Sequence, residues 1–118
     1  MASKDYRDLI VWQRAMDLVE AVYRATRGFP KEEMYGLVGQ MRRCAVSISS
    51  NIAEGQGRGS DGELVRFLRI AAGSLCELET QVVISQRLEL LDAATSTAML
   101  HSSGEVGRLL NGLIRSKS

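Results

Sequence analysis

Residues 49–60, SSNIAEGQGRGS, come closest to a catalytic or ligand-binding motif. Three alternating glycines, beginning with Gly55, surround Arg58. A glycine-rich loop that opens a helix can bind phosphate, because free N–H groups at a helix N-terminus attract anions. Neither the G-x-G-x-x-G spacing of dinucleotide sites nor the Gly-Lys-Ser/Thr ending of a Walker loop is present. We therefore interpret the run as a break between two helices, with Gly55 left-handed at the end of the first and Ser60 capping the second. A weak anion site at Arg58 is the alternative.

Metal and nucleophile chemistry receive little support from the remaining residues. Glu54, Glu77 and Glu79 are carboxylates on segments expected to face each other, as in di-iron bundles. Those bundles use Glu-x-x-His motifs, whereas the single histidine here, His101, stands outside any such motif. Serine and cysteine nucleophiles likewise lack a histidine base. We predict no catalytic residue, no cofactor and no metal site, with His101 on the surface. An enzyme with a carboxylate metal site is the least favoured alternative.

The two cysteines, Cys44 and Cys76, lie far apart in apolar-patterned segments. If the chain folds back around residues 57–60, they come to similar heights on neighbouring helices. Cytosolic disulfides are uncommon, so we predict two free, buried thiols.

Arginines flank the same break and are candidate contacts to nucleic acid: Arg42, Arg43, Arg58, Arg66 and Arg69. Arginine side chains bind phosphate, and salt weakens such binding. The net charge of only +1 is small for a dedicated polyanion binder, but a ring of identical subunits would multiply each arginine. Two Phe, three Tyr and one Trp leave few residues for stacking on bases.

A polar set on the segments either side of the break gives the competing interpretation. We predict that it forms a structural or assembly hydrogen-bond network: Gln40, Arg43, Asn51, Glu54, Glu77 and Glu79. Arg43 and Glu54 could find their partners in Glu77 or Glu79 across the hairpin. For Arg43 and Arg58, assembly and phosphate contact both remain open.

Apolar residues recur at spacings of three and four along nearly the whole chain, which indicates amphipathic helices. We predict helices over 8–28, 31–55, 60–89 and 92–115, with Asp92 as an N-cap. Short links between such helices favour an all-α, antiparallel up-down-up-down four-helix bundle in a single domain spanning residues 1–118. Gly73 lies inside the third helix at a cost of roughly 1 kcal/mol, which predicts close approach of another helix, either within the subunit or between subunits.

The charged start, MASKDYRD, lacks the apolar core of a signal peptide, and no apolar run approaches the ~20 residues that span a bilayer. We expect a cytoplasmic protein with no membrane partner.

Over residues 7–91 the chain resembles the bacterial four-helix-bundle proteins of the 23S rRNA intervening-sequence family. The motifs that carry the resemblance are VWQ, FPKEE.YGL..Q.RR, SI..NIAEG.GR and GS..ELET, in that order. Members often have proline where this chain has Ser49. More distantly, the chain is similar to accessory bundle proteins of diversity-generating retroelements, which bind nucleic acid and a reverse transcriptase.

The resemblance implies a four-helix bundle that assembles into a ring-shaped homo-oligomer, with a pentamer expected and RNA association suggested rather than general. On this resemblance we expect a non-catalytic cytoplasmic protein that forms a ring-like homo-oligomer, with ribosomal or other RNA as a candidate partner. The alternative is an adaptor that recruits a partner protein and makes no RNA contact of its own.

Overall fold

The computed structural model describes residues 5–118, and every regular element among them is helical. Its four long helices are α1 (Ile10–Thr26), α2 (Gly39–Gly57), α3 (Asp61–Arg87) and α4 (Ala93–Lys117). Three short turns complete the elements: the 3₁₀ turns η1 (Tyr6–Asp8) and η2 (Lys31–Glu33), and the π-helical turn η3 (Met34–Val38). This confirms the predicted all-α class.

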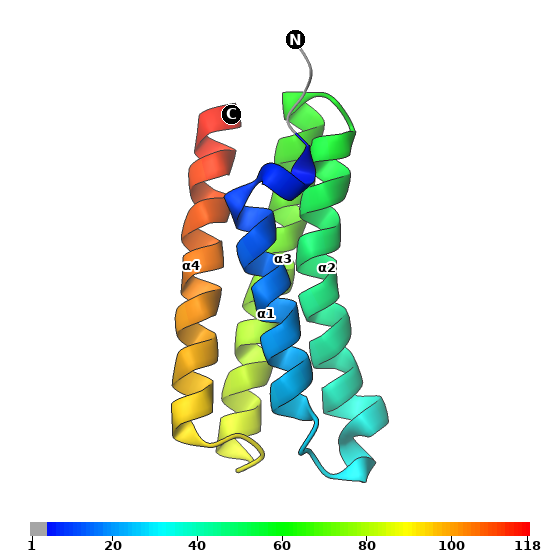
Figure 1. Cartoon of the computed structure of the whole chain (residues 1–118), viewed down its shortest axis with the longest axis vertical. Helices are drawn as coiled ribbons and strands as arrows, with labels where there is room; N and C mark the ends of the chain where they lie inside the picture. The colour runs from blue at the N-terminus through cyan, green and yellow to red at the C-terminus, as the bar shows by residue number, and fades with distance from the viewer. Residues whose placement is uncertain (1–4) are drawn as a thin grey trace.

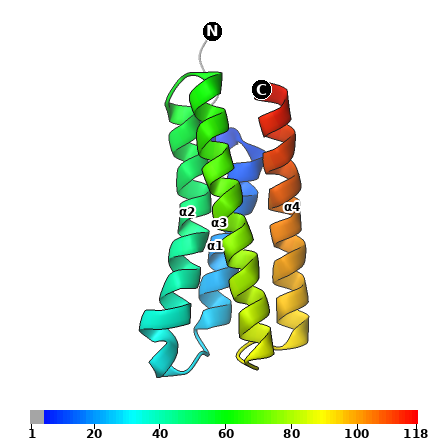
Figure 2. The same ribbon diagram turned by 180° about the vertical axis from the view of Figure 1, so that it is seen from behind.

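The helices form one elongated bundle of 49 × 23 × 19 Å. Helix α1 packs against α2 and α4, and α3 packs against the same two helices. Figures 1 and 2 show each helix running opposite to the one before it, so the start of α1, the end of α4 and the α2–α3 turn lie at one end of the bundle. No helix within residues 5–118 is long and apolar enough to cross a membrane.

The core follows the predicted three-and-four spacing. On α1 the buried residues Val11, Ala15, Leu18 and Val22 recur every three or four positions and so form one face. The other helices contribute fully buried side chains in the same way: Met41, Ile48, Ile52, Leu68, Leu78, Val82, Val106 and Leu110.

Three of the predicted helices agree with α1, α3 and α4 to within two residues at each end. Asp92 caps α4, accepting a hydrogen bond from the Thr95 backbone N–H at 2.6 Å. That bond holds the pKa of Asp92 below its ordinary value.

The predicted second helix, 31–55, is wrong at its start and agrees to within two residues at its end. At its start, η2 and η3 precede α2, and Gly36 adopts φ −103° and ψ −108°, values outside the helical region that kink the chain. At its other end, α2 continues to Gly57.

The prediction that Gly55 ends the helix in a left-handed conformation is also wrong. Gly55 is helical and buried, and a Cβ atom placed on it would lie 2.8 Å from Cβ of Phe67 on α3. Gly59 has the positive φ, 82°, that lets the chain turn. Gly55 therefore allows α2 and α3 to approach each other closely.

Gly73 shows the opposite outcome. An added Cβ there would meet nothing within 4 Å, and the residue is exposed on α3. The predicted close approach of another helix is thus absent within residues 5–118. The remaining alternative is that a helix of a neighbouring subunit approaches Gly73.

Candidate functional site

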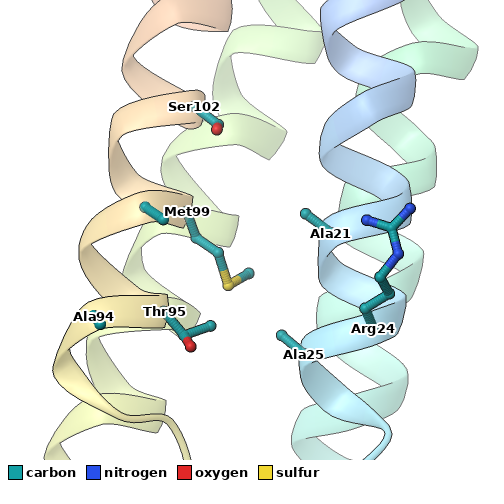
Figure 3. Close-up of a pocket in the computed structure, with 8 residues that line it drawn as sticks. Ala21, Arg24, Ala25, Ala94, Thr95, Met99 and Ser102 are labelled. Carbon is teal, nitrogen blue, oxygen red and sulfur yellow. The ribbon is translucent and has the colours of Figure 1, made fainter.

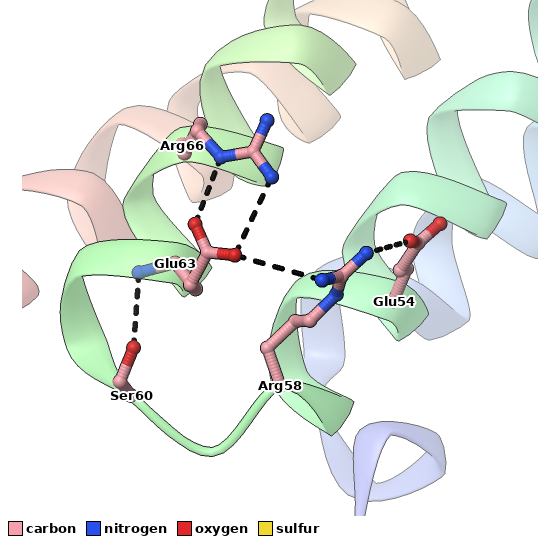
Figure 4. Close-up of polar contacts among 5 residues, drawn as sticks. All are labelled: Glu54, Arg58, Ser60, Glu63 and Arg66. Atoms are coloured by element: carbon pink, nitrogen blue, oxygen red, sulfur yellow. Dashed lines mark hydrogen bonds and ion pairs between the residues drawn. The ribbon is translucent and has the colours of Figure 1, made fainter.

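The strongest charge cluster lies at the α2–α3 turn (Figure 4). The Arg58 guanidinium pairs with Glu54 at 2.7 Å and with Glu63 at 3.7 Å, and Arg66 Nε donates to Glu63 at 2.8 Å. Both guanidinium groups lie over the Phe67 ring, at 4.9 Å for Arg58 and 4.5 Å for Arg66. The Arg66 hydrogen bond, aided by both positive charges, holds the pKa of Glu63 below its ordinary value.

This cluster leaves little free positive charge for an anion. Ser60 caps α3 as predicted, since its hydroxyl oxygen accepts the Glu63 N–H at 3.2 Å. The Glu63 carboxylate binds the two arginines instead of reaching back to complete a capping box. Two arginines thus meet two glutamates, and the cluster joins α2 to α3.

Arg42 is also engaged within the chain. Its Nε donates to Thr26 Oγ1 at 3.0 Å, and its guanidinium lies 4.5 Å from the centre of the Tyr23 ring. Both partners belong to α1, so Arg42 fastens α2 to α1.

Arg43 and Arg69 are exposed and have no hydrogen bond or ion pair with any residue between 5 and 118. They lie on different helices. Along α2, sixteen residues separate Arg42 from Arg58, which is roughly 24 Å of helix. The five candidate arginines therefore form no single basic patch on one subunit.

The predicted polar network takes a different form. Asn51 Nδ2 donates to the carbonyl oxygen of Ser47 at 2.8 Å, and Ser47 Oγ lies 3.0 Å from Ser74 Oγ on α3. Gln81 Nε2 donates to Glu77 at 3.2 Å within α3.

The expected pairing of Arg43 and Glu54 with Glu77 or Glu79 does not occur. Glu54 pairs with Arg58 on its own helix, and no hydrogen bond or ion pair involves Gln40 or Glu79 in the described part of the chain.

Sequence reasoning missed the serine pair that joins α2 to α3. The signal was available, because Ser47 lies ten residues before the end of α2 and Ser74 thirteen residues after the start of α3, which brings them to similar heights in an antiparallel hairpin. The Cys44 thiol also donates to the Ser74 carbonyl oxygen at 3.0 Å. Small polar side chains suit this seam because they satisfy each other without separating the helices.

Two shallow grooves run along the bundle. One, of about 550 Å³, lies between α1 and α4 and is lined mainly by small side chains, including Ala21, Ala25 and Ala94, together with the larger Met99 (Figure 3). Arg24 is its one charged lining residue, and it already pairs with Glu20.

The second groove, of about 640 Å³, lies between α1 and α2 and combines Tyr23, Met34 and Val46 with Arg42 and Arg43. Residues 5–118 bring no three His, Cys, Asp or Glu side chains into a metal-binding group. His101 is exposed, as predicted.

The cysteines are both free, but they differ in exposure. Cys44 is buried, whereas Cys76 is exposed on α3, so the prediction of two buried thiols is wrong for Cys76. Burial, with a smaller contribution from the Glu77 charge, raises the pKa of Cys44 to about 11.

We expect iodoacetamide to alkylate Cys76 and to leave Cys44 unmodified in the native protein at neutral pH. Thiolate is the reactive species, and the buried Cys44 thiol stays protonated. In the unfolded chain, the Cys44 thiol loses its proton above the ordinary thiol pKa of 9.0. The native chain retains that proton up to a pH of about 11, so the free energy of unfolding falls as the pH rises through this range. Mass spectrometry of native and urea-unfolded protein counts the modified thiols. Equal labelling of both cysteines in native protein would contradict the burial of Cys44.

A sequence model of the 23S rRNA-intervening sequence protein family matches residues 7–112. Among solved structures, a protein of unknown function from the S23 ribosomal protein family of Bacteroides thetaiotaomicron VPI-5482 has the same fold, with a TM-score of 0.83. That alignment covers 90% of this chain and 96% of the other, at 20% identity. No curated protein matches the sequence significantly.

Proposed function

The chain belongs to the 23S rRNA-intervening sequence protein family, and we propose that it is a non-catalytic protein that acts by assembling with copies of itself in the cytoplasm. The ring shape and the five subunits in this proposal come from the family resemblance. The structure contributes one observation in its favour, which is a row of apolar side chains on the outer face of α3.

This α3 row consists of Ile70, Val83 and Ile84 on α3 and of Leu88, the residue that follows the helix, and their exposed fractions lie between 37% and 60%. Ile70 and Ile84 are fourteen residues apart, two heptads, and so lie on the same side of the helix. Gly73 lies between them with nothing within 4 Å of where its Cβ would be. The exposed Glu77 lies midway between Ile70 and Ile84, so Val83, Ile84 and Leu88 cluster at one end of the row and Ile70 lies roughly 20 Å away along the axis. Neighbouring exposed apolar side chains mark an interaction site more often than an isolated one does.

The arginines support RNA contact less well than the α3 row supports assembly. Arg42, Arg58 and Arg66 are paired within the subunit, whereas Arg43 and Arg69 have no hydrogen bond or ion pair with any residue from 5 to 118. RNA association and recruitment of a partner protein are therefore the competing outcomes of the test.

Sedimentation velocity of nuclease-treated protein over a range of concentrations tests the proposal. We expect one species whose mass is a multiple of 13.0 kDa, and five subunits if the resemblance extends to ring size. A monomer at all concentrations would contradict self-assembly and favour the adaptor. An assembly that forms only in the presence of copurified nucleic acid and dissociates at high salt would show that contacts to RNA hold the subunits together.

A further inference from the structure

We propose that the α3 row of one copy docks into the groove between α1 and α2 of the next copy, so that two different surfaces form each interface. This inference rests on the proposed self-assembly and names the surfaces that carry it. The α1–α2 groove is defined by Tyr23, Met34, Val46, Arg42 and Arg43.

The groove offers a partly apolar surface with unmatched positive charge. Tyr23, Met34 and Val46 are 38–44% exposed and surround a space of about 640 Å³. Arg43 lines the same space and has no partner within residues 5–118, and no carboxylate lines the groove.

The α3 row offers the complementary surface. Around Val83 and Ile84 lies a shallow depression that is also lined by Cys76, Glu79, Thr80 and Arg87. Arg87 lies eight residues after Glu79, roughly 12 Å along the helix axis, so the two charges stand at different ends of the depression. Glu79 is half-buried and has neither a hydrogen bond nor an ion pair in the described part of the chain. When the α3 row docks into the groove, the Glu79 carboxylate would lie beside the guanidinium of Arg43, which has no partner within residues 5–118.

Exposed large apolar side chains gather at these two surfaces. Apart from Ile10, those in residues 5–118 belong to one of them or adjoin it, namely Tyr23, Met34, Tyr35, Val46, Ile70, Val83, Ile84 and Leu88. Pairing one surface with the other covers both sets together.

Charge argues against each surface pairing with itself. Two grooves face to face would oppose Arg43 to Arg43 with no carboxylate between them, and like charges disfavour such a contact. If two α3 rows met, Glu79 of one copy could pair with Arg87 of the other, which lies eight residues further along the chain. That arrangement would leave both grooves exposed.

The placement of the two surfaces allows repeated docking. Figure 1 has α1 in front of α3, and in the reversed view of Figure 2 α3 is in front, so the two helices lie on opposite sides of the bundle. One copy can therefore bind two neighbours at once. An interface between unlike surfaces closes into a ring when its rotation permits.

Cysteine cross-linking tests which surfaces meet. In a Cys76→Ser background, Val46→Cys and Ile84→Cys are made separately and also coexpressed, then oxidised and run on a non-reducing gel. The buried Cys44 stays out of reach. We expect about tenfold more disulfide-linked dimer from the coexpressed pair than from either variant alone, because the bond requires close Cβ atoms. Val46→Cys coexpressed with His101→Cys is the matched control.

A charge swap gives a second readout. Arg43→Glu and Glu79→Arg should each reduce the mass measured by sedimentation velocity, because each weakens assembly. The double variant should restore the mass of the wild-type assembly. If Arg43→Glu leaves the assembly intact and instead abolishes binding of a single-stranded RNA probe, Arg43 is a phosphate contact and the inference is wrong.

The outcomes separate this inference from the proposed function. If the protein assembles but links Val46→Cys only to itself, links Ile84→Cys only to itself, or links nothing, then self-assembly stands and the pairing of surfaces is overturned. If the wild-type protein is a monomer, both fail.

Discussion

Replacing Gly55 by valine should lower the free energy of unfolding by about 3 kcal/mol, which lowers the melting midpoint by roughly 10 °C. The cause is the close approach of α2 and α3. A Cβ on Gly55 would lie 2.8 Å from Cβ of Phe67 and 3.3 Å from the Leu64 carbonyl oxygen, and neither atom belongs to the flexible end of a side chain. The helices would have to separate at the turn. Urea unfolding followed by circular dichroism measures the change.

Gly112→Ala is the matched control for that substitution. Gly112 lies within α4, and an added Cβ there would meet nothing within 4 Å. Alanine should therefore stabilise the protein by about 0.5–1 kcal/mol, because glycine has more conformational freedom to lose on folding. If Gly55→Val were as stable as the wild type, the close α2–α3 contact would be wrong.

Gly55 also shows where reading the sequence fails. A glycine near a helix end serves equally as a left-handed cap or as a point of close packing, and its neighbours along the chain do not distinguish the two. The cap lies four residues later, at Gly59. Only the partner helix, which brings Phe67 against the backbone, decides between these roles.

The kink before α2 has a similar origin. Lys31, Glu32 and Glu33 after a proline are typical of a first helical turn, and they do form one, as a 3₁₀ turn. The following segment contains Gly36 and Gly39, which weaken the helix, and Gly36 departs from helical dihedral angles. Propensity therefore predicts that a helix begins here, but it does not predict its break.

By contrast, the caps and the core were predictable because they depend on local chemistry and period. Ser60 and Asp92 each accept the backbone N–H three residues on, which their position before an apolar run indicates. The buried faces follow the three-and-four spacing of their helices.

The arginines illustrate competition between local and distant partners. Glu54 and Arg58 are four residues apart, and Glu63 and Arg66 are three apart, so each pair already faces its partner on one helix. Pairing across the hairpin would require long side chains to be ordered over a greater span. Arg58, predicted to contact phosphate or to serve assembly, and Glu54, predicted to join the α2–α3 network, therefore pair with each other.

Ile84→Glu should convert the proposed assembly into folded monomers. Ile84 is 41% exposed in the single subunit, so a glutamate there stays solvated and the bundle retains its helicity. In the assembly the same position lies in an apolar contact. Burying an unpaired carboxylate there costs about 3 kcal/mol or more, roughly a hundredfold in affinity.

Repetition makes this loss large, since in a ring of identical subunits every interface carries the substitution and each loses the same factor in affinity. Sedimentation velocity would show the mass falling to that of one chain, while circular dichroism stays unchanged. His101→Glu adds an equal charge on the exposed surface of α4, outside both proposed surfaces, and should remain assembled. If the Ile84→Glu variant kept the mass of the assembly and the His101→Glu variant lost it, the contact between subunits would be formed by α4. The exposed apolar residues of α3 would then bind something other than a neighbouring subunit.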